Sequence, residues 1–145
     1  MKTFFAVFLV VHGLIHLLGT ARAFDVADIP QLTHQIARPL GILWFLAAAL
    51  FLLAAMLLFI WPQRWWVVGA GAVVVSQAVI LTSWSDARYG TIANIVALVA
   101  VALGFLSQGP SSFRAEYDRE IEQGLGRAVA TPLLTEADLA QTTST

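Results

Sequence analysis

The sequence predicts an all-α integral membrane protein, an antiparallel four-helix bundle with a short amphipathic C-terminal helix, and two observations lead to that class. Of the 145 residues, 59% are hydrophobic and only 12% are charged. Average soluble chains are about 25% charged, and a soluble domain of about this length would leave roughly 30% of its unfolded surface in water. Four long intervals also carry no charged residue. Lipid is therefore the expected solvent for most of the chain.

Each charge-free interval is long enough for one transmembrane helix, since about 20 apolar residues cross a hydrocarbon core about 30 Å thick. Lipid cannot satisfy backbone amides, and these runs lack the alternation of barrel strands, so helices are expected. We predict spans near residues 4–22, 39–61, 65–84 and 91–108, which form one transmembrane domain over residues 1–109. The two short connections that follow the second and third spans force their neighbours to be antiparallel.

Small residues recur along one stripe of each later span, and such stripes let helices approach closely in lipid. The stripes are Gly41, Ala48 and Ala55; Gly69, Ala72, Ser76 and Ser83; and Ala93, Ala97, Ala100, Gly104 and Ser107. We expect them to be interface faces, either inside the bundle or toward a protein partner or a second copy in a homo-oligomer.

The chain changes character at Gly109–Pro110, where charged residues begin. Phe113, Tyr117, Ile121 and Leu125 then recur every four residues among charged side chains. This pattern predicts an amphipathic cytoplasmic helix over residues 110–126, close to the membrane or docked on a partner. Gly124 and Gly126 are expected to end it, and residues 127–145 are expected to be a flexible polar tail.

The Lys and Arg residues predict the orientation, because basic loops are retained in the cytoplasm. Five lie on the side of both termini: Lys2, Arg64, Arg114, Arg119 and Arg127. Three lie on the opposite, outer side: Arg22, Arg38 and Arg88. We therefore expect a multi-pass protein with both termini in the cytoplasm.

The first span also resembles a cleavable signal peptide. Lys2 precedes an apolar stretch that ends in the small residues of Ala21-Arg22-Ala23, as an A-x-A cleavage site would. Cleavage would leave three spans. His12, Gly13 and His16 interrupt the apolar region, which favours retention.

Composition excludes several function classes. The chain has no cysteine, which excludes disulfide scaffolds, thiol redox chemistry, iron–sulfur clusters and Cys-zinc sites. The formal net charge of −1 gives no basic footprint, so nucleic acid is not an expected partner.

Polar side chains inside the spans are the candidate functional residues, because an ionisable group in lipid needs a partner or a purpose. His12 and His16 are four residues apart, so both imidazoles project from one helix face. At about 1.5 Å of rise per residue, Gln77 lies at a similar depth. Asn94 enters the same outer half of the membrane, and Asp86 lies at its rim.

Several chemistries fit this outer-half cluster of His12, His16, Gln77, Asp86 and Asn94. The two histidines could bind a metal ion with Asp86 or His34 as third ligand. A quinone or lipid headgroup suits the depth of the cluster. A bis-histidine haem is disfavoured, because both imidazoles share one face and no other span contains a histidine. In the structural interpretation, the histidines hydrogen-bond Gln77, Asn94 and Ser76 to fix helix register, and no cofactor is held.

The outer rim is expected to be structural. Asp86 lies in the turn before the fourth span, and Arg22, Arg38 and Arg88 come from the two outer connections. Any of these guanidinium groups could pair with the Asp86 carboxylate. Such a pair would hold the first hairpin against the second.

Three segments, His12–Gly19, Ile36–Gly41 and Trp84–Asn94, read HGLIHLLG, IARPLG and WSDARYGTIAN. Together they resemble the membrane region of an uncharacterised bacterial four-helix membrane protein family, whose longer members carry a C-terminal soluble domain of unknown function. The resemblance covers approximately residues 1–123, and residues 134–139 resemble the lead-in to that domain. It implies a bacterial inner membrane location and supplies no mechanism.

The expected function is a non-catalytic membrane module, an anchor or interaction subunit. The first alternative is a small-molecule or metal site in the outer-half cluster. An enzyme is less expected because the sequence shows no activated nucleophile, no paired carboxylates in a span and no phosphate loop. A transporter is less expected still, since four spans without a repeat would need oligomerisation to enclose a path.

Overall fold

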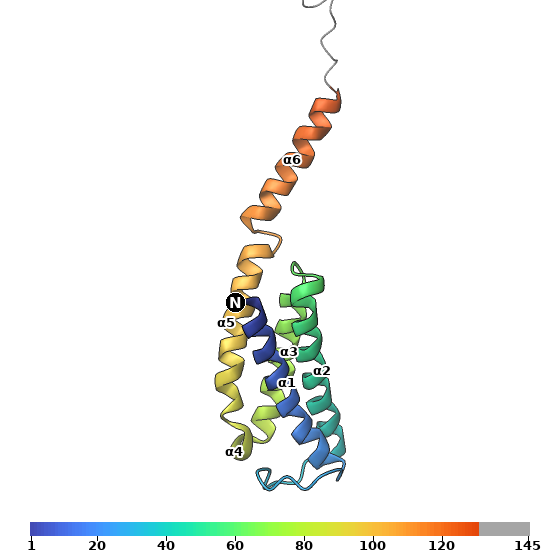
Figure 1. The fold of residues 1–145 in the computed structure, drawn as a ribbon, viewed down its shortest axis with the longest axis vertical. Coiled ribbons are helices and arrows are strands. Elements are labelled where there is room, and N and C mark those ends of the chain that lie inside the picture. The colour runs from blue at the N-terminus through green and yellow to red at the C-terminus, as the bar shows by residue number, and fades with distance from the viewer. Residues whose placement is uncertain (131–145) are drawn as a thin grey trace, which may run out of the picture.

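The computed structural model describes residues 1–130, and this part of the chain is helical without strands (Figure 1). The helices are α1 (Lys2–Ala23), α2 (Arg38–Ile60), α3 (Trp65–Thr82), α4 (Trp84–Ala87), α5 (Gly90–Gln108) and α6 (Phe113–Ala130). By length and composition, α1, α2, α3 and the stretch that begins with α5 can each cross a membrane. The four predicted spans are therefore present as four long apolar helices.

The four long helices lie side by side, and successive ones run in opposite directions (Figure 1). α1 packs on α2, α2 on α3, and α3 on α5. α1 and α5 share no comparably close backbone packing within residues 1–130. Side chains span the seam between them, where Nε2 of His12 lies 3.0 Å from Oδ1 of Asn94.

Glycine allows α1 and α2 to approach closely. A Cβ added at Gly41 of α2 would collide with the Cβ of Ala23 on α1. A Cβ added at Gly19 of α1 would overlap the indole ring of Trp44 on α2. Both contacts lie in the half of the helix pair next to the α1–α2 loop, which we call the outer half. The absence of a side chain at these two positions therefore sets the interhelical distance there.

A layer of polar side chains divides the apolar core in two. One apolar cluster, which includes Leu9, Phe51 and Val73, fills the half toward α6. A second cluster fills the half toward the α1–α2 loop and contains Ala23, Leu32, Ile36, Trp44 and Val79. On α1, α3 and α5 the polar residues described below fall between these clusters or at their boundary. Most of the small residues predicted to line interfaces, such as Ala48 and Ala72, are buried within this chain, whereas Ala93 and Ala100 are half-buried and Ser107 is exposed.

The α1–α2 loop, residues 24–37, covers the outer end of the helices. Its path turns sharply at Asp25, which has a φ of 54°, a left-handed conformation that Asp tolerates better than most residues. Leu32 and Ile36 are buried against Trp44 and Val79. Loop residues thus complete the outer apolar cluster, although they belong to no helix.

The bounds of the spans agree with the sequence prediction within two residues, and two regions differ in a way that has a physical reason. The turn before the fourth span contains the short helix α4 (Trp84–Ala87), and the third span ends at Thr82. The amphipathic helix begins at Phe113 and continues to Ala130, past both Gly124 and Gly126. A glycine in a helix costs about 1 kcal/mol, which is too little to end a helix whose neighbouring residues favour it. The predicted polar tail otherwise lies outside the described residues.

The predicted apolar stripe of α6 is present and uncovered. Phe113, Tyr117, Ile121 and Leu125 are all exposed. α6 contacts α5 and extends away from the other helices (Figure 1).

Candidate functional site

Five polar side chains from three helices form a hydrogen-bonded layer at one depth, which we call the polar layer: His12, His16, Ser76, Gln77 and Asn94. His12 and His16 come from α1 and are 5% and 2% exposed. Their placement toward the neighbouring helices agrees with the prediction from their spacing. Ser76 and Gln77 come from α3 and Asn94 from α5, so the layer joins helices that are distant in sequence.

With the amide group of Asn94 oriented as in the structure, the hydrogen-bond network assigns the tautomers of the two histidines. The amide oxygen Oδ1 of Asn94 accepts from Nε2 of His12 at 3.0 Å and from the Ser76 hydroxyl at 2.9 Å. Because the Ser76 proton points to Asn94, its oxygen accepts from Nε2 of His16 at 2.9 Å. A neutral imidazole carries one N–H, so Nδ1 of both histidines is a hydrogen-bond acceptor.

The polar layer continues toward the start of α5. Nδ2 of Asn94 donates to Oε1 of Gln77 at 3.0 Å, and Nε2 of Gln77 donates to the hydroxyl of Thr91 at 3.2 Å. Each of the two side-chain amides therefore donates through its nitrogen to the next residue of the chain of hydrogen bonds. The histidines thus bond Asn94 and Ser76, as the structural interpretation predicts, whereas Gln77 bonds Asn94 and not a histidine.

Aromatic rings enclose the imidazoles. His12 packs edge-on against Phe51 with ring centroids 4.7 Å apart, and His16 stacks on the same ring at 5.8 Å. The rings of His16 and Trp44 are 5.2 Å apart. These contacts hold each imidazole in a fixed orientation in addition to its hydrogen bond.

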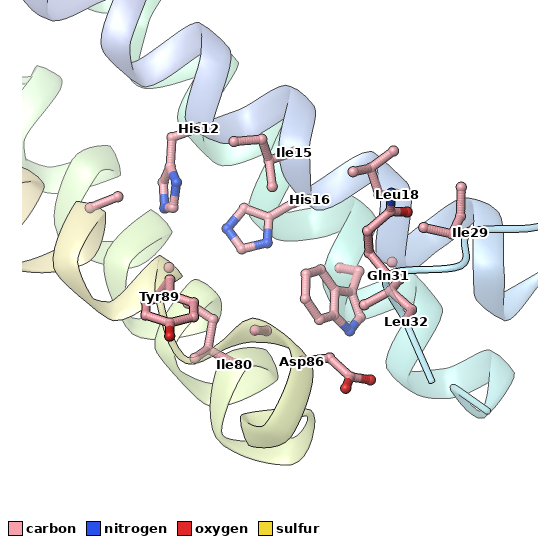
Figure 2. A pocket seen from close by; sticks show the side chains of 15 residues that line it. His12, Ile15, His16, Leu18, Ile29, Gln31, Leu32, Ile80, Asp86 and Tyr89 are labelled. Carbon is pink, nitrogen blue, oxygen red and sulfur yellow. The ribbon is translucent and has the colours of Figure 1, made fainter. Parts of the chain in front are cut away.

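A cavity of about 360 Å³ lies at the seam between α1 and α5 and is called here the seam cavity. Figure 2 shows His12 and His16 projecting from α1 toward it, with Ile80, Asp86 and Tyr89 on its opposite side. The remaining lining is mostly apolar and includes Ile15, Leu18, Gly19, Ile29, Leu32, Trp44 and Ala93. Ligand pockets typically combine such apolar walls with a few polar groups.

Two buried nitrogens of the cavity lining have no hydrogen-bond partner within residues 1–130. They are Nδ1 of His16 and Nε1 of Trp44, whose side chains are 2% and 3% exposed. Buried polar atoms are almost always hydrogen-bonded in native proteins, so each exception needs an explanation.

Asp86 closes the outer rim of the cavity. Its carboxylate accepts hydrogen bonds from the backbone N–H and the hydroxyl of Thr33, each at 2.8 Å, and from the backbone N–H of His34 at 3.3 Å. The side chain is 8% exposed. The hydroxyl of Thr33 and the two backbone amides lower the pKa of Asp86 to about 2, because all of them favour the charged carboxylate. Asp86 thereby fastens the α1–α2 loop to α4.

We call the hydrogen bonds from Thr33 and His34 to the Asp86 carboxylate the Asp86 clasp. Its loss should lower the stability of the folded protein. We expect Asp86→Ala to melt at a lower temperature in detergent than Asp28→Ala, because Asp28 makes only an exposed ion pair with Arg22. The lowered pKa of Asp86 also predicts a pH dependence. The stabilisation is complete above about pH 4 and is lost as the pH falls toward 2. The melting temperatures of the wild type and of Asp86→Ala should therefore converge as the pH is lowered from 6 to 2. Equal melting temperatures of the wild type and the variants at pH 6 would contradict the Asp86 clasp.

The predicted arginine partners of Asp86 are wrong. Arg22 pairs with Asp28 at 2.9 Å, and the guanidinium of Arg88 lies over the Tyr89 ring, 5.1 Å from its centroid. Arg22 and Arg38 instead line a second, more polar cavity of about 410 Å³ beside the loop. Neutral donors, the backbone N–H groups of Thr33 and His34 and the hydroxyl of Thr33, satisfy the Asp86 carboxylate. These groups are compact, so they fit at the little-exposed rim better than a long arginine side chain would.

No group of three His, Cys, Asp or Glu side chains that could hold a metal ion occurs within residues 1–130. His12 and His16 each use Nε2 in a hydrogen bond, and the predicted third ligands, Asp86 and His34, contact each other at the rim. The arrangement favours hydrogen bonding over metal ligation.

The structure thus brings four of the predicted site residues, His12, His16, Gln77 and Asn94, into one network and places Asp86 at the rim of the same cavity. Sequence reasoning missed Trp44 and Thr33. A signal for Trp44 existed, since it lies well inside its span rather than at an interface, but Thr33 lies in a loop without periodicity.

Comparisons with protein-family models, with curated proteins and with solved structures find no match. The resemblance of residues 1–123 to a bacterial membrane protein family therefore stays a prediction. The function has to be argued from the site itself.

Proposed function

We propose that this chain is a four-span membrane protein that forms an antiparallel bundle in a bacterial inner membrane, with both termini in the cytoplasm. The outward faces of the long helices support insertion, since large apolar residues there are exposed in the isolated chain. Examples are Ile42, Phe45, Val74, Ile92 and Leu103. Contact of these side chains with lipid would cost no free energy, whereas their contact with water would be unfavourable.

The same proposal retains α1 in the mature protein. His12 and His16 of α1 complete the polar layer, and α1 is packed along α2. Removal of α1 as a signal peptide would leave Ser76 and Asn94 without these partners.

The topology has a direct test. A reporter fused after Thr145 should behave as cytoplasmic, and a tag before Met1 should stay on the mature protein. Periplasmic activity of the C-terminal reporter would overturn the orientation, and loss of the N-terminal tag would overturn the retention of α1.

The function that the geometry supports best is the binding of a small amphipathic molecule taken from the bilayer, a quinone or a lipid, in the seam cavity. One observation carries this proposal: a mostly apolar cavity of about 360 Å³ has two buried, unpartnered nitrogens in its lining. Ile15, Leu18 and Tyr89 line the same cavity and are exposed. In the membrane these residues would face lipid, so the cavity would open sideways into the bilayer.

The role we propose is binding without catalysis, as part of an anchor or interaction subunit. Nε2 of both histidines is committed to the polar layer, and aromatic packing holds the rings. Groups held in this way suit recognition of a headgroup. A protein partner would dock on the exposed stripe of α6, which the cytoplasmic orientation leaves accessible.

Filling the cavity tests the binding proposal. Ala93→Phe places a ring in the cavity lining, and Ala102→Phe on the exposed face of the same helix is the matched control. We expect decylubiquinone, decylubiquinol or 1-monodecanoylglycerol to raise the melting temperature of the wild type and of Ala102→Phe, because a ligand that binds only the folded state stabilises it. The increase should be absent in Ala93→Phe. An equal increase in both variants, or no increase with any of the three probes, would overturn the proposal.

A further inference from the structure

The two unpartnered nitrogens at the seam cavity have opposite hydrogen-bonding roles. Nε1 of Trp44 is an indole N–H and can only donate. Nδ1 of His16 can only accept, because the proton of that imidazole is on Nε2 and is directed to Ser76. The two rings are neighbours, with centroids 5.2 Å apart. One donor and one acceptor are therefore carried by two adjacent rings, and both of these residues line the same cavity.

We infer that the headgroup bound in the seam cavity carries a hydroxyl, which accepts a hydrogen bond from Nε1 of Trp44 and donates its proton to Nδ1 of His16. This inference rests on the proposed binding function and names the class of its ligand. A hydroxyl is the smallest group that donates and accepts through a single atom. A quinone carbonyl or an ether oxygen would satisfy Trp44 and leave His16 without a partner.

The ligand class is accordingly a hydroxyl headgroup on an apolar tail. Both a quinol ring and a glycerol monoester present this chemistry. The apolar lining beyond the two nitrogens, including Ile15 and Leu18, would contact the start of the tail, and the rest would extend into lipid. Neither nitrogen exposes surface in this conformation, so the side chains that cover the two nitrogens must shift as the headgroup enters, while the two rings keep their orientation.

The inference is tested with two probes that differ in one group. 4-Decylphenol has the hydroxyl, and 4-decylanisole replaces its proton by a methyl group while keeping the oxygen as an acceptor. Titration calorimetry of the full chain in detergent should give an affinity about tenfold higher for the phenol, since one buried hydrogen bond to His16 is gained. The same preference of decylubiquinol or of 1-monodecanoylglycerol over its own O-methyl ether would support the inference and show which source supplies the headgroup.

Two variants separate the two contacts. His16→Phe keeps an aromatic ring beside Trp44 and Phe51 and removes Nδ1, while the Ser76 hydroxyl still donates to Asn94. The ratio of the two affinities should therefore fall to about one. Trp44→Phe removes the indole donor, which both probes use, so both affinities should fall and the ratio should stay near tenfold. Trp84→Phe, outside the cavity lining, should change neither affinity.

The outcomes distinguish the inference from the proposed function. Equal affinities of the phenol and the anisole in the wild type, both abolished by Ala93→Phe, would keep the binding site and overturn the hydroxyl. An unchanged ratio in folded His16→Phe would also overturn it. Absence of binding by every probe would overturn the proposed function itself. If His16→Phe does not fold, the wild-type ratio and Trp44→Phe still decide the question.

Discussion

Replacement of Asn94 by leucine is expected to lower the free energy of unfolding in detergent by about 2–4 kcal/mol. Asn94 is the centre of the polar layer, where its oxygen accepts from His12 and Ser76 and its nitrogen donates to Gln77. Leucine has a similar size but leaves all three groups without this partner. A buried unsatisfied polar group costs about 1–3 kcal/mol, and alternative partners in a micelle reduce the sum.

The control for Asn94→Leu is Ser107→Ala on the same helix. The Ser107 hydroxyl donates only to carbonyls of its own helix, at Leu103 and Gly104, so its removal should have little effect. The double variant Asn94→Leu/Gln77→Leu should be less destabilised than the sum of the two single variants, because the two amides bond each other. Strict additivity, measured by chemical unfolding, would contradict a connected layer.

Gly41→Ala is expected to destabilise the protein by about 1–3 kcal/mol through overpacking. The added methyl group would collide with the Cβ of Ala23, which is fixed to the backbone of α1 and cannot rotate away. α1 and α2 would have to separate at their outer ends, where Leu32 and Ile36 pack beside them. Thermal unfolding in detergent measures the effect.

Gly71→Ala provides the matched control in α3. A Cβ at Gly71 meets nothing within 4 Å, so alanine there should leave stability unchanged or raise it by up to about 1 kcal/mol. Similar losses in the two variants would show that the cost arises from helix backbone effects and not from the contact between α1 and α2.

The four spans and the inward-facing histidines could be predicted because each depends on a strong regularity. Apolar runs without charge locate helices within a few residues, and a spacing of four places His12 and His16 on one face. Depth counted along the helices also brought Gln77 and Asn94 toward the histidines. These predictions need only the geometry of a straight helix.

The clasp and the cavity depend on contacts that no periodicity encodes. Asp86 accepts hydrogen bonds from Thr33, which is 53 residues away in an irregular loop, and does not pair with the arginines that its charge suggested. Trp44 reaches the cavity because Gly19 on the facing helix has no side chain. The fit of the Trp44 ring against Gly19 can be recognised only when the relative position of the two helices is known.

The polar layer has a consequence for the order of assembly during synthesis. His12 and His16 emerge from the ribosome with the first helix, while their partners follow 82 residues later at Asn94 and 60 residues later at Ser76. In the proposed membrane topology, the newly inserted α1–α2 hairpin therefore carries two imidazoles whose permanent partners do not yet exist, and an early chain in lipid would hold them at a free-energy cost. Insertion of α3 would supply the partner of His16, and insertion of α5 would supply the partner of His12, so the fourth span would complete the fixing of the first.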